Sequence, residues 1–289
     1  MLQRTLTAAV GIPVLVAAVW FGSPGLTVLI AVVAVLGVRE FYGLRPKGVS
    51  PLPVVLGMIW AVAFVAGAQA SSDLNSFLVI SFIIMAVGAG ACLLWLIAYY
   101  TSGRPVTASI YLLAGPVYAG FLLAHALALH EIGDTSGESL VASGVVSDLV
   151  SSQAGRDWLL FTLLIVFGTD TGAYLVGKTF GTHAMAPVIS PSKTWEGAAG
   201  GFIFALVIAA IASYALDLDI PLWQPMVIGA CVGVVTQAGD LFESKLKRMS
   251  NVKDASSIIP GHGGVLDRLD SVVVSIPLVY YLVATVFEP

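Results

Sequence analysis

The chain has 289 residues, of which 58% are hydrophobic and only 10% are charged, and its mean hydropathy is +0.95. A soluble domain carries about 25% charged residues, so these charges are too few to cover a surface that faces water. The net charge of −4 also argues against a polybasic nucleic-acid-binding protein. Lipid is therefore the expected solvent for most of the exterior.

Nine apolar windows are long enough to cross a bilayer as helices, which requires about 20 mostly apolar residues. Helices are favoured over strands because each run is unbroken and must satisfy its own backbone polar groups in hydrocarbon. Proline and glycine occur within several windows, and membrane helices tolerate them when neighbouring groups bond the freed carbonyls. The sequence therefore predicts an all-α, polytopic transmembrane helix bundle. The windows are about 5–22, 25–42, 52–70, 77–100, 108–130, 158–177, 197–216, 222–243 and 269–287.

The N-terminal segment has some features of a signal peptide, because Arg4 is followed by an apolar stretch that ends at Phe21. However, it lacks a convincing small-x-small cleavage site, and a second apolar run follows at once. We therefore expect this segment to be retained as the first span.

The basic residues predict the orientation of the spans. With the N-terminus in the cytoplasm, only Arg156 of the 13 basic residues falls outside. Such a bias is the positive-inside pattern, so we expect a multi-pass protein of the plasma membrane with a cytoplasmic N-terminus. The basic residues on the cytoplasmic side are then Arg4, Arg39, Arg45, Lys47, Arg104, Lys178, Lys193, Lys245, Lys247, Arg248, Lys253 and Arg268.

The acidic residues indicate where chemistry is expected. Most acids on the cytoplasmic side follow residue 169, whereas the outside loop at about 131–157 is rich in Ser, Gly and acids and has the composition of a solvated, flexible segment. We divide the chain into residues 1–155, with about five spans and this loop, and residues 156–289, a catalytic region with about four spans. The cytoplasmic acids are Glu40, Asp170, Glu196, Asp240, Glu243, Asp254, Asp267 and Asp270.

The segment 237–248 (Gln-Ala-Gly-Asp-Leu-Phe-Glu-Ser-Lys-Leu-Lys-Arg) places Asp240 and Glu243 three residues apart at the predicted end of a span. On a helix these carboxylates share a face, where they repel each other unless a cation or a basic side chain compensates them. Lys247 could do so from one turn further on. The segment alone therefore fits either a solvated salt bridge or part of a metal site.

The segment 253–271 repeats this spacing in Asp267 and Asp270, at the expected start of the last span. Acids at a helix start are also favoured by the helix dipole, which is the alternative interpretation of this pair. The glycines around His262 permit close approach of the backbone to phosphate oxygens. Carboxylate oxygens suit Mg²⁺, and basic side chains balance the remaining phosphate charge.

Two earlier segments have similar chemistry. Asp170 lies within a span, where an acid is costly and is a functional candidate unless it pairs with a neighbouring helix. The segment 190–197 (Ser-Pro-Ser-Lys-Thr-Trp-Glu-Gly) places Ser192 and Lys193 before a helix start, which suits a phosphate. The alternative is a helix N-cap with an interfacial Trp anchor.

Residues 244–270 resemble the signature of the phosphatidate cytidylyltransferases (CDP-diacylglycerol synthases). The pattern is Ser-x-apolar-Lys-Arg, four residues, Lys-Asp, then Pro-x-His-Gly-Gly, apolar-x-Asp-Arg-apolar-Asp, and all of it is present. The segments 169–174 and 191–197 also resemble this family, whereas the first 155 residues alone do not identify it. The resemblance implies transfer of the cytidylyl group of CTP to phosphatidic acid with Mg²⁺, giving CDP-diacylglycerol and pyrophosphate.

This reaction joins two polyanions and needs charge compensation more than a general base, because the lipid phosphate is already ionised. With Mg²⁺, the sequence leaves open a second metal or a monovalent cation. His262 would orient a phosphate oxygen, or alternatively pack within its loop. The expected catalytic residues are Asp240, Asp267, Asp270, Lys253 and His262, and the expected metal ligands are Asp240, Asp267, Asp270 and Glu243. The expected substrate-binding residues are Asp170, Ser192, Lys193, Lys247, Arg248, Gly263, Gly264 and Arg268.

Two other functions compete with this interpretation. A secondary transporter would place its site near the bilayer midplane and often shows inverted repeats, which we do not detect. A related transferase acting on a polyprenyl or ether-lipid phosphate is poorly distinguished, because pockets for lipid chains need only apolar residues. Glycine and alanine within the spans permit helix association, so a homodimer is one option and the oligomeric state is left open.

Overall fold

The fold is described from a computed structural model that describes residues 2–101, 103–132, 153–259, 261 and 263–287. The chain forms two compact units. Unit 1 comprises Met1–Glu131 and Met249–Leu269, and unit 2 comprises Ile132–Arg248 and Asp270–Pro289. His262 and most of the predicted outside loop lie outside the described residues.

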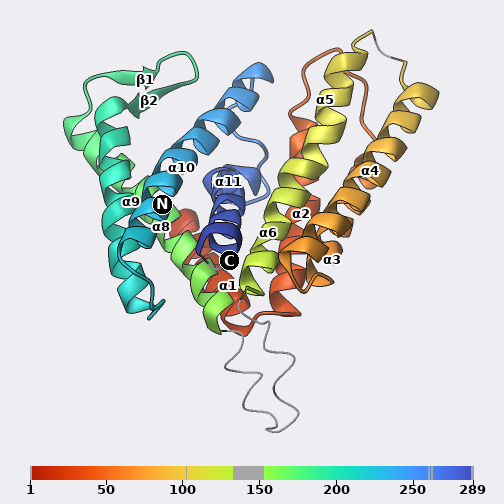
Figure 1. The fold of residues 1–289 in the computed structure, drawn as a ribbon. Helices are drawn as coiled ribbons and strands as arrows, with labels where there is room; N and C mark the ends of the chain where they lie inside the picture. Colours follow the sequence, from red (N-terminus) through yellow and green to blue (C-terminus); the bar gives the residue numbers. More distant parts are fainter. Residues whose placement is uncertain (1, 102, 133–152, 260, 262, 288–289) are drawn as a thin grey trace, which may run out of the picture. The chain divides into compact units, whose positions relative to one another are not determined.

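The prediction of an all-α, polytopic membrane protein is confirmed, because every predicted window is helical (Figure 1). Seven helical stretches among the described residues are long and apolar enough to cross a membrane, and two shorter apolar helical stretches, Ala9–Phe21 and Val54–Gln69, lie in the first and third windows. The helices are α1 (Leu2–Phe21), α2 (Gly25–Gly43), α3 (Val54–Gln69), α4 (Leu74–Tyr99), α5 (Pro105–Pro116), η1 (Val117–Phe121), α6 (Leu122–His130), α8 (Gln153–Phe180), α9 (Trp195–Ala215), α10 (Trp223–Met249), α11 (Leu266–Leu282) and η3 (Val283–Phe287).

Some helix boundaries differ from the predicted windows. Helix α4 begins three residues early because Asp73 caps it, with its Oδ1 accepting a hydrogen bond from the Ser76 backbone N–H at 3.0 Å. Helix α8 begins at Gln153, so Arg156 and Asp157 are helical and not part of the loop, and they form an ion pair at 2.9 Å. Hydropathy windows do not detect capping residues, so they assign the polar residues at helix ends to loops.

Unit 1 gathers its loops at two opposite ends, as the predicted alternation of spans requires. At one end, Arg104 Nη1 donates to the Lys47 carbonyl at 3.2 Å, and Ser250 Oγ bonds the Leu44 carbonyl. At the other end, Gln69 Nε2 donates to Glu131 Oε1 at 2.8 Å. The first end contains the loops predicted to be cytoplasmic, although which end faces the cytoplasm stays a prediction.

Helices α5, η1 and α6 form one continuous stretch that passes through Pro116. Proline has no N–H to donate to the carbonyl four residues earlier, which is that of Leu112. Tyr42 on α2 supplies the missing donor, since its hydroxyl bonds the Leu112 carbonyl at 2.8 Å. Its buried ring lies so close to Gly57 and Gly115 that a Cβ at either position would clash with it. A neighbouring helix thus satisfies the freed carbonyl, as was expected for prolines within spans.

Unit 2 is built on α8 and α9, which pack side by side over their length (Figure 1). Glycine makes this approach possible: a Cβ on Gly201 would lie 2.9 Å from the Thr169 carbonyl, and one on Gly200 would lie 2.4 Å from Val176. Helix α10 contacts α9 in the same way, because a Cβ on Gly229 would lie 2.8 Å from Ala209 Cβ. Close helix packing through small residues is typical of membrane bundles.

Ser192 and Lys193 precede a helix start, as predicted, but they lie in a hairpin that the sequence did not indicate. Strand β1 (Ala184–Ala186) pairs antiparallel with β2 (Ser190–Thr194) to form a hairpin. Strand pairing depends on the partner strand, and the short segment has no alternating hydrophobic pattern that would predict it. Ser192 and Lys193 therefore lie on a strand, and Thr194 is the N-cap of α9.

The bond between Tyr42 and Leu112 can be tested with Tyr42→Phe, which keeps the ring and removes only the hydroxyl. We expect the free energy of unfolding to fall by about 1–3 kcal/mol, because a buried carbonyl loses its donor. The control is Tyr214→Phe, since Tyr214 is 87% exposed. The measurement is thermal unfolding in detergent, and equal stability of the two variants would contradict this account.

Candidate active site

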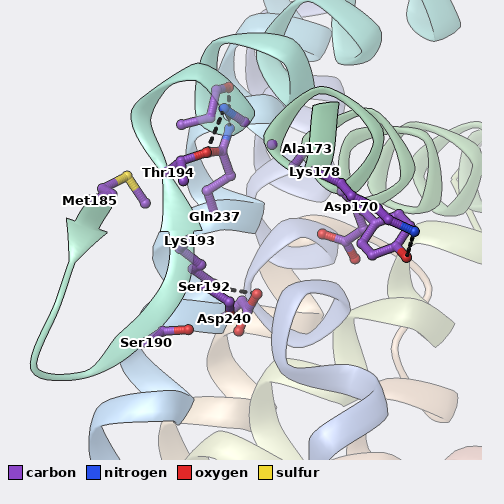
Figure 2. Close-up of a pocket in the computed structure, with 14 residues that line it drawn as sticks. Asp170, Ala173, Lys178, Met185, Ser190, Ser192, Lys193, Thr194, Gln237 and Asp240 are labelled. Carbon is purple, nitrogen blue, oxygen red and sulfur yellow. Dashed lines mark hydrogen bonds and ion pairs between the residues drawn. The ribbon is translucent and has the colours of Figure 1, made fainter. Parts of the chain in front are cut away.

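A cavity of about 590 Å³ lies within unit 2, where α8, β2, α9 and α10 meet. It brings together three segments that the sequence singled out separately, around Asp170, around Lys193 and around Asp240. Figure 2 shows the residues of β2 facing Asp170 of α8 across this space. The lining residues are Asp170, Ala173, Tyr174, Gly177, Lys178, Met185, Ser190, Ser192, Lys193, Thr194, Gly197, Ala198, Gln237 and Asp240.

The strongest contact in the cavity is the ion pair between Lys193 of β2 and Asp240 of α10. Their Nζ and Oδ2 atoms are 2.6 Å apart, and both side chains are partly shielded from solvent. A charge-assisted contact of this length in a shielded place is stronger than an exposed salt bridge. The expected clustering of Ser192, Lys193, Asp170 and Asp240 is therefore present, and the hairpin is the element that brings the lysine to the carboxylates.

Two further aspartates of unit 2 lie near this pair. Asp170 on α8 interacts electrostatically with Lys193 and Asp240, and also with Asp270 on α11. Asp270 in turn interacts with Asp240. We call Asp170, Asp240 and Asp270 the aspartate cluster. It places three carboxylates from three helices near Lys193 and Lys247, so it has an excess of negative charge that a cation would relieve.

The metal site predicted from Asp240, Asp267, Asp270 and Glu243 stays a prediction. Among the residues that the structure describes, no three His, Cys, Asp or Glu side chains are gathered closely enough to hold an ion. The donors of the aspartate cluster are nevertheless carboxylate oxygens, which is the chemistry that Mg²⁺ requires. Because Mg²⁺ commonly keeps several waters and binds substrate phosphates, a full set of protein ligands is not a condition for its binding.

Glu243 forms the salt bridge with Lys247 that the helical spacing suggested. The two groups are 3.1 Å apart, but the pair is buried and not solvated, since the side chains of Glu243 and Lys247 are 1% and 13% exposed. Helix α10 continues to Met249, so the whole of the segment 237–248 is helical. Lys247 therefore compensates the charge of Glu243, whereas the charge of Asp240 is compensated by Lys193 of β2.

Glu196 of α9 anchors the hairpin that carries Lys193. Its Oε1 accepts hydrogen bonds from Thr182 Oγ1 at 2.7 Å and from His183 Nδ1 at 2.6 Å. Its Oε2 accepts from the backbone N–H groups of the same two residues at 3.1 and 3.2 Å. Arg248, predicted to bind phosphate, holds the other side of the hairpin through a bond from its Nε to the Ile189 carbonyl at 3.2 Å. These contacts set where Lys193 can lie.

Gln237 is a cavity residue that was not predicted as a site residue, although it belongs to a segment that was. Its Nε2 donates to the carbonyls of Ala198 at 3.1 Å and Gly233 at 2.8 Å, which ties α10 to α9. A polar amide within an apolar span could have identified it, as it identified Asp170. Tyr174 and Lys178 of α8 also line the cavity and were not predicted as site residues.

In unit 1, Asp267 organises the loop that precedes α11. Its Oδ2 accepts from the backbone N–H groups of Ala255 at 2.9 Å and Gly264 at 2.7 Å. A Cβ on Gly263, whose φ is +84°, would lie 2.6 Å from the same oxygen. The structure thus gives these glycines a contact with a carboxylate, while their predicted binding of phosphate stays untested.

The other predicted residues of this loop are placed only in part. Lys253 and Arg268 are exposed, which is compatible with the predicted contact to a phosphate. His262 lies outside the described residues. The roles of all three stay predictions.

Comparison with known proteins supports the resemblance found in the sequence. The sequence model of the cytidylyltransferase family matches residues 2–286. A phosphatidate cytidylyltransferase of Bacillus subtilis is 45% identical over 132 residues, which cover 46% of this chain and 49% of the relative. The phosphatidate cytidylyltransferases of Staphylococcus saprophyticus and Staphylococcus aureus are each 44% identical over 128 residues, with 44% of this chain and 49% of each relative covered. The chain thus spans about half the length of these curated relatives.

The anchoring role of Glu196 can be tested with Glu196→Ala, which removes all four hydrogen bonds to Thr182 and His183. We expect backbone amides of residues 181–194 to exchange several-fold faster with deuterated solvent, because the hairpin loses its attachment to α9. Hydrogen exchange followed by mass spectrometry measures this. The control is Asp217→Asn at the other end of α9, and unchanged exchange in Glu196→Ala would show that the hairpin does not need this anchor.

Proposed function

Because the chain belongs to the cytidylyltransferase family, we propose that it transfers the cytidylyl group of CTP to phosphatidic acid, forming CDP-diacylglycerol and pyrophosphate. The names of the relatives and the signature in residues 244–270 support this substrate pair. The observation that carries the proposal is the cavity of unit 2. There, Lys193 and the carboxylates of Asp170 and Asp240 gather from three segments distant in the sequence.

Lys193 binds the phosphates of CTP in this proposal. An ammonium group has three N–H donors, so Lys193 can keep its contact with Asp240 and still donate to phosphate oxygens. Ser192, its neighbour on β2, adds a hydroxyl donor at the same cavity wall. The hairpin anchored by Glu196 and Arg248 keeps both groups in place before the nucleotide arrives, which lowers the entropy cost of binding.

In the proposed reaction, a phosphate oxygen of phosphatidic acid attacks the α-phosphorus of CTP. The bond between the α-phosphorus and the oxygen that bridges to the β-phosphorus breaks, and its electron pair leaves with pyrophosphate. Since the lipid phosphate is already largely ionised at pH 7, no side chain has to remove a proton from it. The task of the protein is to hold two polyanions together and to stabilise the charge that develops on the leaving group.

We propose that Mg²⁺ is the cofactor, because the aspartate cluster supplies the hard oxygen donors that this ion prefers. When bound, Mg²⁺ neutralises phosphate charge and helps pyrophosphate to leave. Asp240 and Asp270 would hold it in unit 2, with Asp170 as a supporting acid. Asp267 and Glu243 are proposed ligands on the basis of the family resemblance.

The proposed location is the plasma membrane, with the cavity open to the cytoplasm, where CTP is available. In unit 2, the residues at the cavity end of the helices include Lys178, Lys193 and Arg248, and an excess of basic residues is typical of the cytoplasmic side. Phosphatidic acid would reach the protein from the surrounding membrane. A homodimer stays a prediction.

The proposal is tested by incubating the full chain in lipid nanodiscs with CTP labelled at the α-phosphate and with phosphatidic acid. We expect the label to enter lipid only when Mg²⁺ is present. Parallel samples with a polyprenyl phosphate or an ether-linked phosphatidic acid test the alternative acceptors. Label in one of these lipids alone would replace phosphatidic acid as the substrate, and no label in any lipid would reject the transferase function.

Within the same assay, Lys193→Met removes the cation that pairs with Asp240 and keeps an apolar side chain of similar length. We expect the rate of CDP-lipid formation to fall about 10- to 100-fold, because a hydrogen bond to a charged group contributes about 1.5–3 kcal/mol. Lys245→Met is the matched control, since Lys245 is an exposed lysine of α10 that does not line the cavity. Equal rates in the two variants would remove Lys193 from the site.

The proposed metal role of Asp267 is tested with Asp267→Asn. The amide oxygen can still accept from Ala255 and Gly264, so the loop keeps its anchor while the charge is lost. We expect a fall of at least about 100-fold in the rate and a higher Mg²⁺ concentration for half-maximal activity. Formation of CDP-lipid at a near-normal rate, measured as a function of Mg²⁺, would contradict the assignment of Asp267 as a ligand.

A further inference from the structure

Glu40 on α2 is a buried carboxylate that lies outside every motif discussed above. Only 3% of the residue is exposed, and it lies in a helix long and apolar enough to cross a membrane. Burying an ionised carboxylate is costly unless hydrogen-bond donors surround it. The donors around Glu40 therefore show what the residue does in the fold.

All the described donors to Glu40 come from the segment 255–266, more than 200 residues further along the chain. Its Oε1 accepts from Ser256 Oγ at 2.6 Å and from the Val265 backbone N–H at 3.0 Å. Its Oε2 accepts from the Leu266 backbone N–H at 2.8 Å. Leu266 is the first residue of α11, where backbone N–H groups have no acceptor within the helix and the helix dipole favours a negative charge.

Gly264 completes this contact by its lack of a side chain. A Cβ at this position would lie 2.6 Å from Glu40 Oε2, which is closer than atoms can approach. The last glycine of the Gly-His-Gly-Gly sequence is therefore required by the position of Glu40. This physical reason for the glycine involves no ligand.

Asp267 holds the same segment from its other side through the N–H groups of Ala255 and Gly264. The donors to the two carboxylates alternate along the chain: Ala255 and Gly264 bond Asp267, whereas Ser256 and Val265 bond Glu40. The described residues at the two ends of the segment 255–266 are thus held between them. Loss of one carboxylate would free the segment on that side and change the surroundings of the other.

We propose that Glu40 is a positioning residue for the transferase reaction, which it serves by fixing the segment 255–266 and, through it, Asp267. Glu40 itself contacts neither substrate nor metal. The part of Glu40 in the reaction rests on the proposed function. Its anchoring of the segment 255–266 can be measured without any reaction. Helix α2 lies outside the family signature in residues 244–270. The proposal gives this helix a part in the activity.

The central variant is Glu40→Gln, which keeps the size of the side chain. Both carboxylate oxygens accept hydrogen bonds, so the amide must direct its NH₂ group at one set of donors and lose those bonds. We expect amides in residues 255–266 to exchange at least about tenfold faster, with unchanged exchange in the hairpin at 184–194. The rate of CDP-lipid formation should fall about 10- to 100-fold, with a raised Mg²⁺ requirement like that of Asp267→Asn.

The matched control is Glu131→Gln, which alters a carboxylate of the same unit that bonds Gln69 at the opposite end. It should leave both exchange in residues 255–266 and the Mg²⁺ requirement unchanged. If Glu40→Gln does not fold, Ser256→Ala removes one donor to Glu40, and smaller changes in the same direction are expected.

A double-mutant cycle tests the contact between Glu40 and Gly264 directly. Gly264→Ala should reduce activity strongly in the wild-type background, because its Cβ meets the carboxylate. In the Glu40→Ala background the same substitution should cost clearly less, since the colliding atoms are gone. Additive effects would show that the two residues do not act through this contact and would count against the proposal.

The possible outcomes separate this proposal from the proposed function. Unchanged exchange in Glu40→Gln would overturn the anchoring role. Faster exchange with a normal rate and a normal Mg²⁺ requirement would limit Glu40 to stability and would overturn its positioning role. If the wild-type chain forms no CDP-lipid, the transferase function fails and the positioning role fails with it, while the exchange data still decide whether Glu40 anchors the segment.

Discussion

The structure depends on one constraint: a charged group near hydrocarbon must be surrounded by opposite charge or by hydrogen-bond partners. Glu243 is almost completely buried and is compensated by Lys247, one helical turn away. Asp240 takes its partner, Lys193, from a strand more than 40 residues earlier in the chain. Because such partners come from other segments, each satisfied charge also fixes the place of one element against another. The positions of the charged side chains are therefore part of what holds each unit together.

Close approach of helix backbones is the second condition for the cavity. Gly197 and Gly201 let α9 approach the carbonyls of Ala173 and Thr169 on α8 so closely that a side chain on either glycine would collide with them. This contact brings the start of α9, and the hairpin before it, against the α8 wall that carries Asp170. Small residues in the C-terminal spans thus serve the site indirectly, because they determine how near the polar residues can come.

The glycines of the motif loop show how one residue pattern can have two physical causes. Their freedom from a side chain suggests close approach of a phosphate, and the family resemblance supports the same interpretation. The described contacts are instead with the carboxylates of Asp267 and Glu40. Both causes can apply to one protein, since a loop that binds a charged substrate must first be held in one conformation. In the sequence, Glu40 is an acid near the end of an apolar window. This position indicates only that the carboxylate needs a partner, and it does not show which residue that partner is.

The sequence by itself determined that most of the exterior faces lipid and that all nine windows are helical. It also determined that successive loops of unit 1 lie at alternate ends of its helices. These properties depend on local hydropathy and length, which can be read from consecutive residues. It also identified Asp170, Lys193 and Asp240, because charged residues are conspicuous in an apolar chain. Only the tertiary structure decided that segment 184–194 forms a hairpin, that Tyr42 replaces the donor missing at Pro116 and that Glu40 holds the loop before α11. Each of these depends on a partner from another segment, and no local pattern specifies which partner that is.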